Sequence, residues 1–134
     1  MSDSITNVEP TPRAITNFEV SPTSLEVWAV DGPGSGGANH CYEISGYSAP
    51  DLPEGSCYTS IHFQDGPIGE TGPNGITCGS LIAICIDRLE AFQRGPYASE
   101  HNAAALSHLQ SAIGCLFDRT RARMARGVEG TSAL

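Results

Sequence analysis

The feature that most constrains the fold is a pair of amphipathic segments separated by only a few residues. Gly95-Pro96 ends the first segment at about residue 93, and Ser99 is a suitable N-cap for a second that runs to about Arg126, with Gly127 at its C-cap. Two long helices joined by so short a loop must pack antiparallel, so the sequence predicts a helical hairpin over 78–127. Apolar side chains recur at helical spacing in both segments: Leu81, Ile82, Cys85, Ile86, Leu89 and Phe92, then Leu106, Leu109, Ile113 and Leu116.

The half of the chain before the hairpin is rich in Pro and Gly. It contains three short runs typical of strands, over 24–31, 41–47 and 58–64, separated by turn-forming residues. Residues 1–22 hold three prolines and little apolar content, so they are predicted to be a flexible arm. We therefore expect an α+β fold, in which a small antiparallel sheet within 23–77 precedes the hairpin and forms a single domain with it over 23–134.

The apolar surface of the hairpin is large for a chain of 134 residues. A small sheet leaves part of two apolar stripes uncovered, so the hairpin is predicted to mediate oligomerisation. In the alternative interpretation the sheet covers both stripes.

Charge is distributed unevenly along the chain. Residues 1–77 hold ten acidic residues and one basic residue, whereas 78–134 hold five and six, so the net charge of −8 lies almost wholly in the first half. Polymeric nucleic acid requires an extended basic surface and is therefore not an expected partner. All seven basic residues are arginine, which favours planar recognition of anions, although arginine-biased codon usage would give the same composition.

The sequence predicts neither a membrane span nor a signal peptide. No run of about 18 apolar residues is present, and the N-terminus has no basic region followed by an apolar stretch, so we expect a cytoplasmic protein. None of the five cysteines has CxxC spacing, which argues against a zinc site or a disulfide framework. Reduced cysteines within the core are expected.

Three arginines share one face at the end of the second predicted helix. Arg119, Arg123 and Arg126 fall within an arc of roughly 60° at 100° per residue, while Arg121 lies across the helix. They form either a solvated basic helix end that offsets the helix dipole, or a clamp for phosphate or pyrophosphate.

Two further residues are candidates for ligand contacts. Asn102 lies in the first turn of the second helix, where it either caps the helix or projects into a pocket. Phe92 lies on the apolar stripe of the first helix, where it either packs in the core or stacks on a base.

No catalytic motif is recognisable. The four histidines lack HxxxH or HExxH spacing, GxSxG is absent, and GPGSGG at 32–37 lacks the Lys-Ser/Thr of a P-loop. His101 and His108 could share a helix face but have no third metal ligand in view. We therefore expect no catalytic residue, no metal site and no cofactor.

Residues 60–131 resemble the phage Thoeris anti-defense family, and the helical half is similar to the hairpin domain shared with phage anti-CBASS nucleotide sponges. The matching stretches are IHFQDGPIGETGPNGIT (61–77), IAICIDRLEAFQ (82–93), GPYASEHNAAAL (95–106) and RTRARMARGVEGT (119–131). Their ordered combination carries the resemblance, and no single stretch would.

The resemblance implies a non-enzymatic anti-defense protein of the host cytoplasm. It would sequester glycocyclic ADP-ribose, a signal made by a bacterial TIR-domain enzyme, in pockets between the protomers of a dimer or a hexamer. Cyclic di- and trinucleotides stay open as further ligands. By this resemblance Phe92 stacks on the ligand, Asn102 bonds it, and Arg119, Arg123 and Arg126 lie where phosphate contacts are expected.

Two other functions stay open from the sequence. One is a hydrolase of the same signal, and the other is an inhibitor whose acidic sheet binds a host defence factor. Residues 1–59 lie outside the resemblance, so no ligand contact is assigned there.

Overall fold

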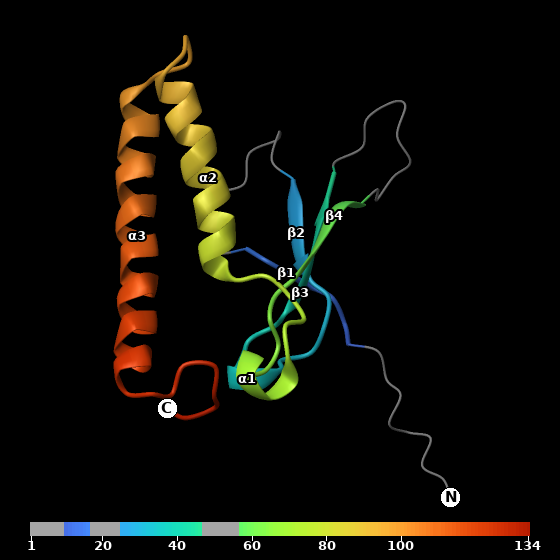
Figure 1. Cartoon of the computed structure of the whole chain (residues 1–134). Coiled ribbons are helices and arrows are strands. Elements are labelled where there is room, and N and C mark those ends of the chain that lie inside the picture. The colour runs from blue at the N-terminus through green and yellow to red at the C-terminus, as the bar shows by residue number, and fades with distance from the viewer. Residues whose placement is uncertain (1–9, 17–24, 47–56) are drawn as a thin grey trace, which may run out of the picture. The chain divides into compact units, whose positions relative to one another are not determined.

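A computed structural model describes residues 10–16, 25–46 and 57–134 of the chain. The chain divides into two compact units, residues 1–66 and 67–134, and each is described by itself. The elements follow the predicted α+β order, with strands in the first unit and helices in the second (Figure 1). A single domain over 23–134 stays a prediction.

The first unit contains a four-stranded antiparallel sheet with strand order β1-β2-β3-β4. The strands are β1 (Arg13–Ala14), β2 (Glu26–Ala29), β3 (Cys41–Ser45) and β4 (Cys57–His62), with a short 3-10 helix, η2 (Ser35–Gly37), between β2 and β3. The predicted small sheet in the N-terminal half is confirmed. Its edge strand β1 falls in the segment predicted to be a flexible arm, and residues 1–9 and 17–22 of that arm lie outside the described residues.

The core of this unit is sparse. Among the residues whose burial is described, only Ala29 on β2 and His40 just before β3 are buried. Tyr42 and Phe63 add an edge-to-face aromatic contact, with ring centroids 5.7 Å apart. A unit with so few buried apolar groups depends on polar contacts to fix its loops.

The second unit contains α1 (Ile68–Thr71), α2 (Cys78–Gln93) and α3 (Glu100–Ala125). The cap of α2 is reciprocal, because Oγ1 of Thr77 accepts from the amide of Ser80 at 3.2 Å and Oγ of Ser80 accepts from the amide of Thr77 at 3.1 Å. Ser99 caps α3 by accepting from the amide of Asn102 at 3.0 Å. Both long helices begin and end within one residue of the predicted bounds.

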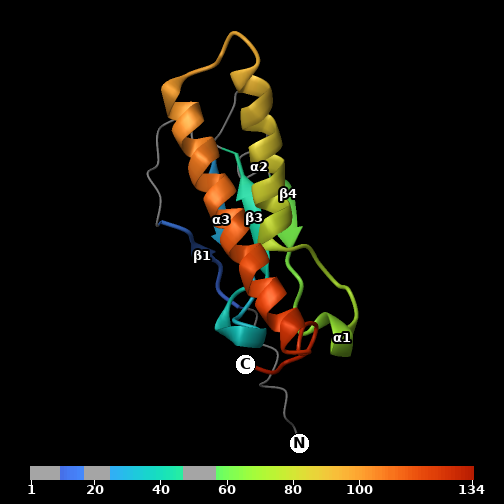
Figure 2. The same ribbon diagram turned by 60° about the vertical axis from the view of Figure 1, so that its left-hand side comes forward.

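The two long helices lie side by side, joined by the loop 94–99 (Figure 2). The half-buried positions of each helix repeat every three or four residues, as antiparallel packing requires. On α2 they include Leu81, Ile82, Ile86, Leu89 and Gln93, and on α3 they include Asn102, Leu106, Leu109, Ile113, Thr120 and Arg123. Cys85 and Phe92, which the sequence placed on the buried stripe of α2, lie exposed at its edge.

Cysteines occupy the surface of the hairpin. Cys78, Cys85 and Cys115 are exposed free thiols, and Cys41 in the sheet unit is a half-buried one. The expectation of core cysteines is therefore wrong for the three in the hairpin, because each lies outside the face that the two helices bury against each other. No helix in the described ranges is long and apolar enough to cross a membrane.

Candidate functional site

The loop between the long helices is closed by polar contacts. Nε2 of Gln93 donates to the carbonyl of Ser99 at 3.1 Å, and Oε1 of Gln93 accepts from the amide of Ser99 at 3.0 Å. Nδ2 of Asn102 donates to the carbonyl of Tyr97 at 3.3 Å. Within the described part of the chain, Oδ1 of Asn102 accepts no hydrogen bond, so this half-buried amide has a fixed orientation and an acceptor left for a ligand.

An aromatic group and a guanidinium lie together near the same loop. Phe92 is 37% exposed, and Cζ of Arg88 lies 5.4 Å from the centroid of its ring. This is cation–π distance between residues one helical turn apart. Arg88 was not among the residues predicted from the sequence, although its spacing of four residues from Phe92 was a signal for this contact. The pair offers a π-face and a positive charge to a planar anionic ligand.

The arginines near the end of α3 have different surroundings. In the described ranges Arg119 has no hydrogen bond or ion pair, whereas Arg126 donates to the backbone oxygen of Leu134. Arg123 forms an ion pair with Glu129 at 3.1 Å and also bonds backbone carbonyls. Arg121 pairs with Asp118, in accordance with its predicted place across the helix. The three arginines thus share a helix face but are not equally available to an anion.

The predicted ligand residues fall into two groups at opposite ends of the hairpin. Phe92 and Asn102 lie beside the loop 94–99, while Arg119 is 17 residues further along α3 from Asn102. At 1.5 Å per residue, this separation is about 25 Å along the helix axis. Figure 1 shows the loop and the C-terminus at opposite ends of α3. One chain therefore does not bring all five candidates to one small ligand.

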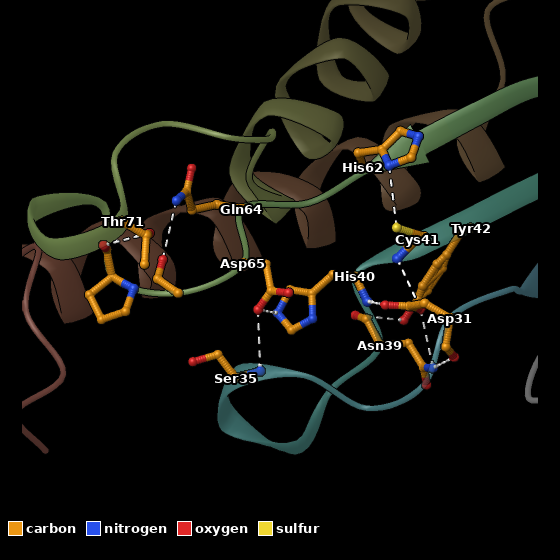
Figure 3. A network of polar contacts seen from close by, with 12 residues as sticks. Asp31, Ser35, Asn39, His40, Cys41, Tyr42, His62, Gln64, Asp65 and Thr71 are labelled. Carbon is orange, nitrogen blue, oxygen red and sulfur yellow. Dashed lines mark hydrogen bonds and ion pairs between the residues drawn. The ribbon is translucent and has the colours of Figure 1, made fainter. Parts of the chain in front are cut away.

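A second polar cluster lies in the sheet unit, around Asp31 (Figure 3). Its carboxylate accepts hydrogen bonds from the backbone amides of His40 and Cys41, at 3.0 and 3.1 Å, and its carbonyl accepts from Nδ2 of Asn39 at 2.5 Å. Burial raises the pKa of Asp31, but these hydrogen bonds outweigh it and lower the pKa below its usual value. Asp31 therefore fastens the two ends of the segment 31–41 together.

The glycine-rich segment 32–37 is held by a second carboxylate. Oδ1 of Asp65 accepts from the amide of Ser35 at 3.3 Å and lies 3.7 Å from Nε2 of the buried His40. A carboxylate that accepts a hydrogen bond from this amide leaves the amide unavailable to a phosphate, and its charge repels anions. This agrees with the absence of the P-loop lysine from the sequence.

A thiol and an imidazole meet across strands β3 and β4. Sγ of Cys41 lies 3.3 Å from Nδ1 of His62. Burial raises the pKa of the Cys41 thiol, and the charges of Asp31 and Asp65 raise it further. The thiol is therefore protonated at neutral pH and is a poor nucleophile. The described residues contain no group of three or more His, Cys, Asp or Glu side chains suited to hold a metal ion.

Comparison with known proteins finds a family match over part of the helical hairpin. The model of the Acb2/Tad1 hairpin domain matches residues 59–114. The chain is also 43% identical, over 72 residues, to Thoeris anti-defense 1 of Bacillus phage SBSphiJ7. That alignment covers 54% of this chain and 51% of the relative, so the chain spans about half the length of the curated protein it matches.

The domain match includes one of the two candidate groups. Phe92 and Asn102 lie inside it, and it ends before Arg119. Residues 59–114 therefore match the Acb2/Tad1 hairpin domain, and the resemblance of this chain to the Thoeris anti-defense family is confirmed.

Proposed function

We propose that this chain is a phage anti-defense protein that binds a small nucleotide-type immune signal in the host cytoplasm and sequesters it without cleavage. One observation carries the proposal: the Acb2/Tad1 hairpin match contains an exposed aromatic, Phe92, and an oriented amide, Asn102, beside one loop. The name of the relative, Thoeris anti-defense 1, supports the biological role.

The chemistry of the two groups suits a nucleotide that contains a diphosphate. The ring of Phe92 can stack on an adenine, Oδ1 of Asn102 can accept from a ribose hydroxyl, and the arginines can pair with phosphates. We propose glycocyclic ADP-ribose, the product of a bacterial TIR-domain enzyme, as the principal ligand. Cyclic di- and trinucleotides share its bases and phosphates and are the secondary candidates. A sponge needs nanomolar affinity, on the order of −12 kcal/mol.

The separation of the two groups supports a site shared between chains. A small ligand cannot span about 25 Å along α3 to meet Asn102 and Arg119 of one chain. Two chains can supply one group each, in a dimer or in a hexamer built from dimers. Large apolar side chains that would be covered in such an assembly are exposed on the long helices: Ile84, Leu116, Phe117 and Met124.

Calorimetric titration with glycocyclic ADP-ribose, and in parallel with cyclic di- and trinucleotides, tests this function. The bound ligand is then released by heat and identified by chromatography. Tight binding with intact release is the expected result. A cleaved product would make the chain a hydrolase, whereas no binding together with salt-sensitive capture of a host protein would make it the acidic inhibitor.

Two substitutions test the site. Phe92→Ala and Asn102→Ala are each expected to weaken binding about 10-fold or more, because stacking or a hydrogen bond to a buried group is lost. Glu90→Ala removes an exposed side chain of α2 that has no hydrogen bond or ion pair in the described ranges, and it serves as the control. Full affinity in both site variants would refute the assignment.

A further inference from the structure

The guanidinium of Arg123 is bound almost completely by the chain that follows α3. Nε donates to Oε1 of Glu129 at 3.1 Å. Nη1 donates to the carbonyl of Ala133 at 2.8 Å, and Nη2 donates to the carbonyls of Val128 and Thr131 at 2.9 and 3.0 Å. A guanidinium has five N–H donors, so one donor remains for any other partner. The side chain is only 11% exposed.

Residues 128–133, which we call the C-terminal strap, are also bound to α1. The amide of Gly69 donates to the carbonyl of Gly130 at 2.8 Å, and Oγ of Ser132 donates to Oε1 of Glu70 at 3.3 Å. A Cβ built on Gly69 would lie 2.5 Å from the carbonyl oxygen of Gly130, so the two backbones meet where only glycine fits. The strap is thus fixed between Arg123 on one side and α1 on the other.

A phosphate could bind Arg123 only by displacing these partners. The carbonyls would lose their donor, and the charge of Glu129 already neutralises the guanidinium. Neither obstacle applies to Arg119, which is exposed and has no partner in the described ranges. Arg126 has a single hydrogen bond to release, to the backbone oxygen of Leu134.

We propose that Arg123 is a positioning residue that binds the C-terminal strap in place of the ligand, and that the ligand's anion meets Arg119 and Arg126. This assignment narrows the three-arginine clamp expected from the sequence to two arginines separated by two helical turns. The part that concerns the anion rests on the proposed function. The part that concerns the strap rests only on contacts within residues 67–134.

Hydrogen–deuterium exchange of the strap amides tests the structural part without a ligand. Arg123→Ala and Arg123→Lys are both expected to speed exchange across the strap about 10-fold or more, because a lysine keeps the charge but not the planar fork. Arg119→Ala is the matched control and should leave the strap unchanged. Exchange in α2 shows that each variant is folded. Unchanged strap exchange in both Arg123 variants would overturn the proposal.

A double-mutant cycle distinguishes positioning from direct contact with the ligand. Gly69→Ala pushes the strap away from α1 and leaves Arg123 in place. If Arg123 acts through the strap, adding Arg123→Ala to Gly69→Ala should change the Kd for glycocyclic ADP-ribose by less than about 3-fold. The effects of Arg119→Ala and Gly69→Ala should multiply. If Arg123→Ala weakens binding and its effect on the Kd multiplies with that of Gly69→Ala, Arg123 is a ligand contact.

The two experiments fail separately. If the wild-type chain does not bind glycocyclic ADP-ribose, the proposed function fails, while faster strap exchange in the Arg123 variants still supports the role of Arg123 in holding the strap. If the wild-type chain binds but strap exchange is unchanged in both Arg123 variants, the proposed function stands and the positioning role is refuted.

Discussion

Both carboxylate oxygens of Asp31 accept a hydrogen bond from the backbone amide of His40, at 3.0 and 3.2 Å. Burial raises the pKa of Asp31, but these bonds contribute to lowering it below its usual value of 3.8. The unfolded chain therefore binds this proton first as the pH falls. The stability that Asp31 contributes is present above pH 3.8 and is lost as the pH falls through the lower folded value. Thermal unfolding between pH 6 and pH 2 should show this loss.

Substitution of Asp31 should remove that pH dependence. Asp31→Asn loses one acceptor oxygen and is expected to destabilise the sheet unit by about 1–3 kcal/mol at neutral pH. Glu43→Gln is the matched control, because the Glu43 side chain makes no hydrogen bond in the described part of the chain and should change stability little. Denaturant unfolding measures both variants. Equal effects of the two substitutions would contradict the role of Asp31.

Two glycines of one loop should respond differently to alanine. A Cβ on Gly34 would lie 2.8 Å from Nδ1 of the buried His40 and 3.0 Å from Oδ1 of Asp65, whereas a Cβ on Gly32 meets nothing within 4 Å. Gly34→Ala is therefore expected to cost about 1–3 kcal/mol of unfolding free energy, and Gly32→Ala less than about 0.5 kcal/mol. Denaturant titration compares them. A neutral Gly34→Ala would show that His40 moves freely.

The hairpin could be predicted from the sequence because its determinants are local. Apolar spacing, the Ser99 cap and the Gly95-Pro96 break lie within a few turns of one another, so the helix bounds were accurate to one residue. Strand β1 could not be found, because two residues, Arg13 and Ala14, have no detectable period and depend on pairing with β2.

The candidate site could be predicted from the sequence only in part. The residue types at Phe92 and Asn102 suggested ligand contacts, and the separation of Asn102 from Arg119 follows from the predicted bounds of the second helix. Which arginines are already bound within the chain does not follow from them. The partners of Arg123 are mostly backbone carbonyls of a tail without regular structure. Such acceptors are the same for every residue type, so no sequence signal marks them.

The cysteines should differ in reactivity. The thiol of Cys41 is half-buried and its pKa is raised by burial and by Asp31 and Asp65, whereas Cys85 and Cys115 are exposed on the hairpin. Because only the thiolate reacts, iodoacetamide at pH 7.5 should alkylate Cys41 about 10-fold more slowly than the exposed pair. Peptide mass spectrometry over time measures each rate. Faster reaction at Cys41 would point to an activated thiol and revive the hydrolase hypothesis. The measurement is made on the protein as purified, so any oligomer is present. Slow alkylation of Cys85 or Cys115 would then show that this part of the hairpin surface is covered by another chain.

Mixing two inactive variants tests whether the ligand site is shared between chains. Phe92→Ala removes the group beside the loop 94–99, and Arg119→Ala removes the arginine about 25 Å along α3. In an oligomer whose sites take one group from each of two chains, an equal mixture with free subunit exchange contains about a quarter of its sites intact. Calorimetry should therefore recover about a quarter of the wild-type binding capacity for glycocyclic ADP-ribose.

A mixture of the Phe92→Ala variant with the double variant is the control and should recover none, because every site then lacks the aromatic ring. If the first mixture also binds nothing while mass spectrometry shows mixed oligomers, the two groups belong to separate sites, and the shared pocket is wrong.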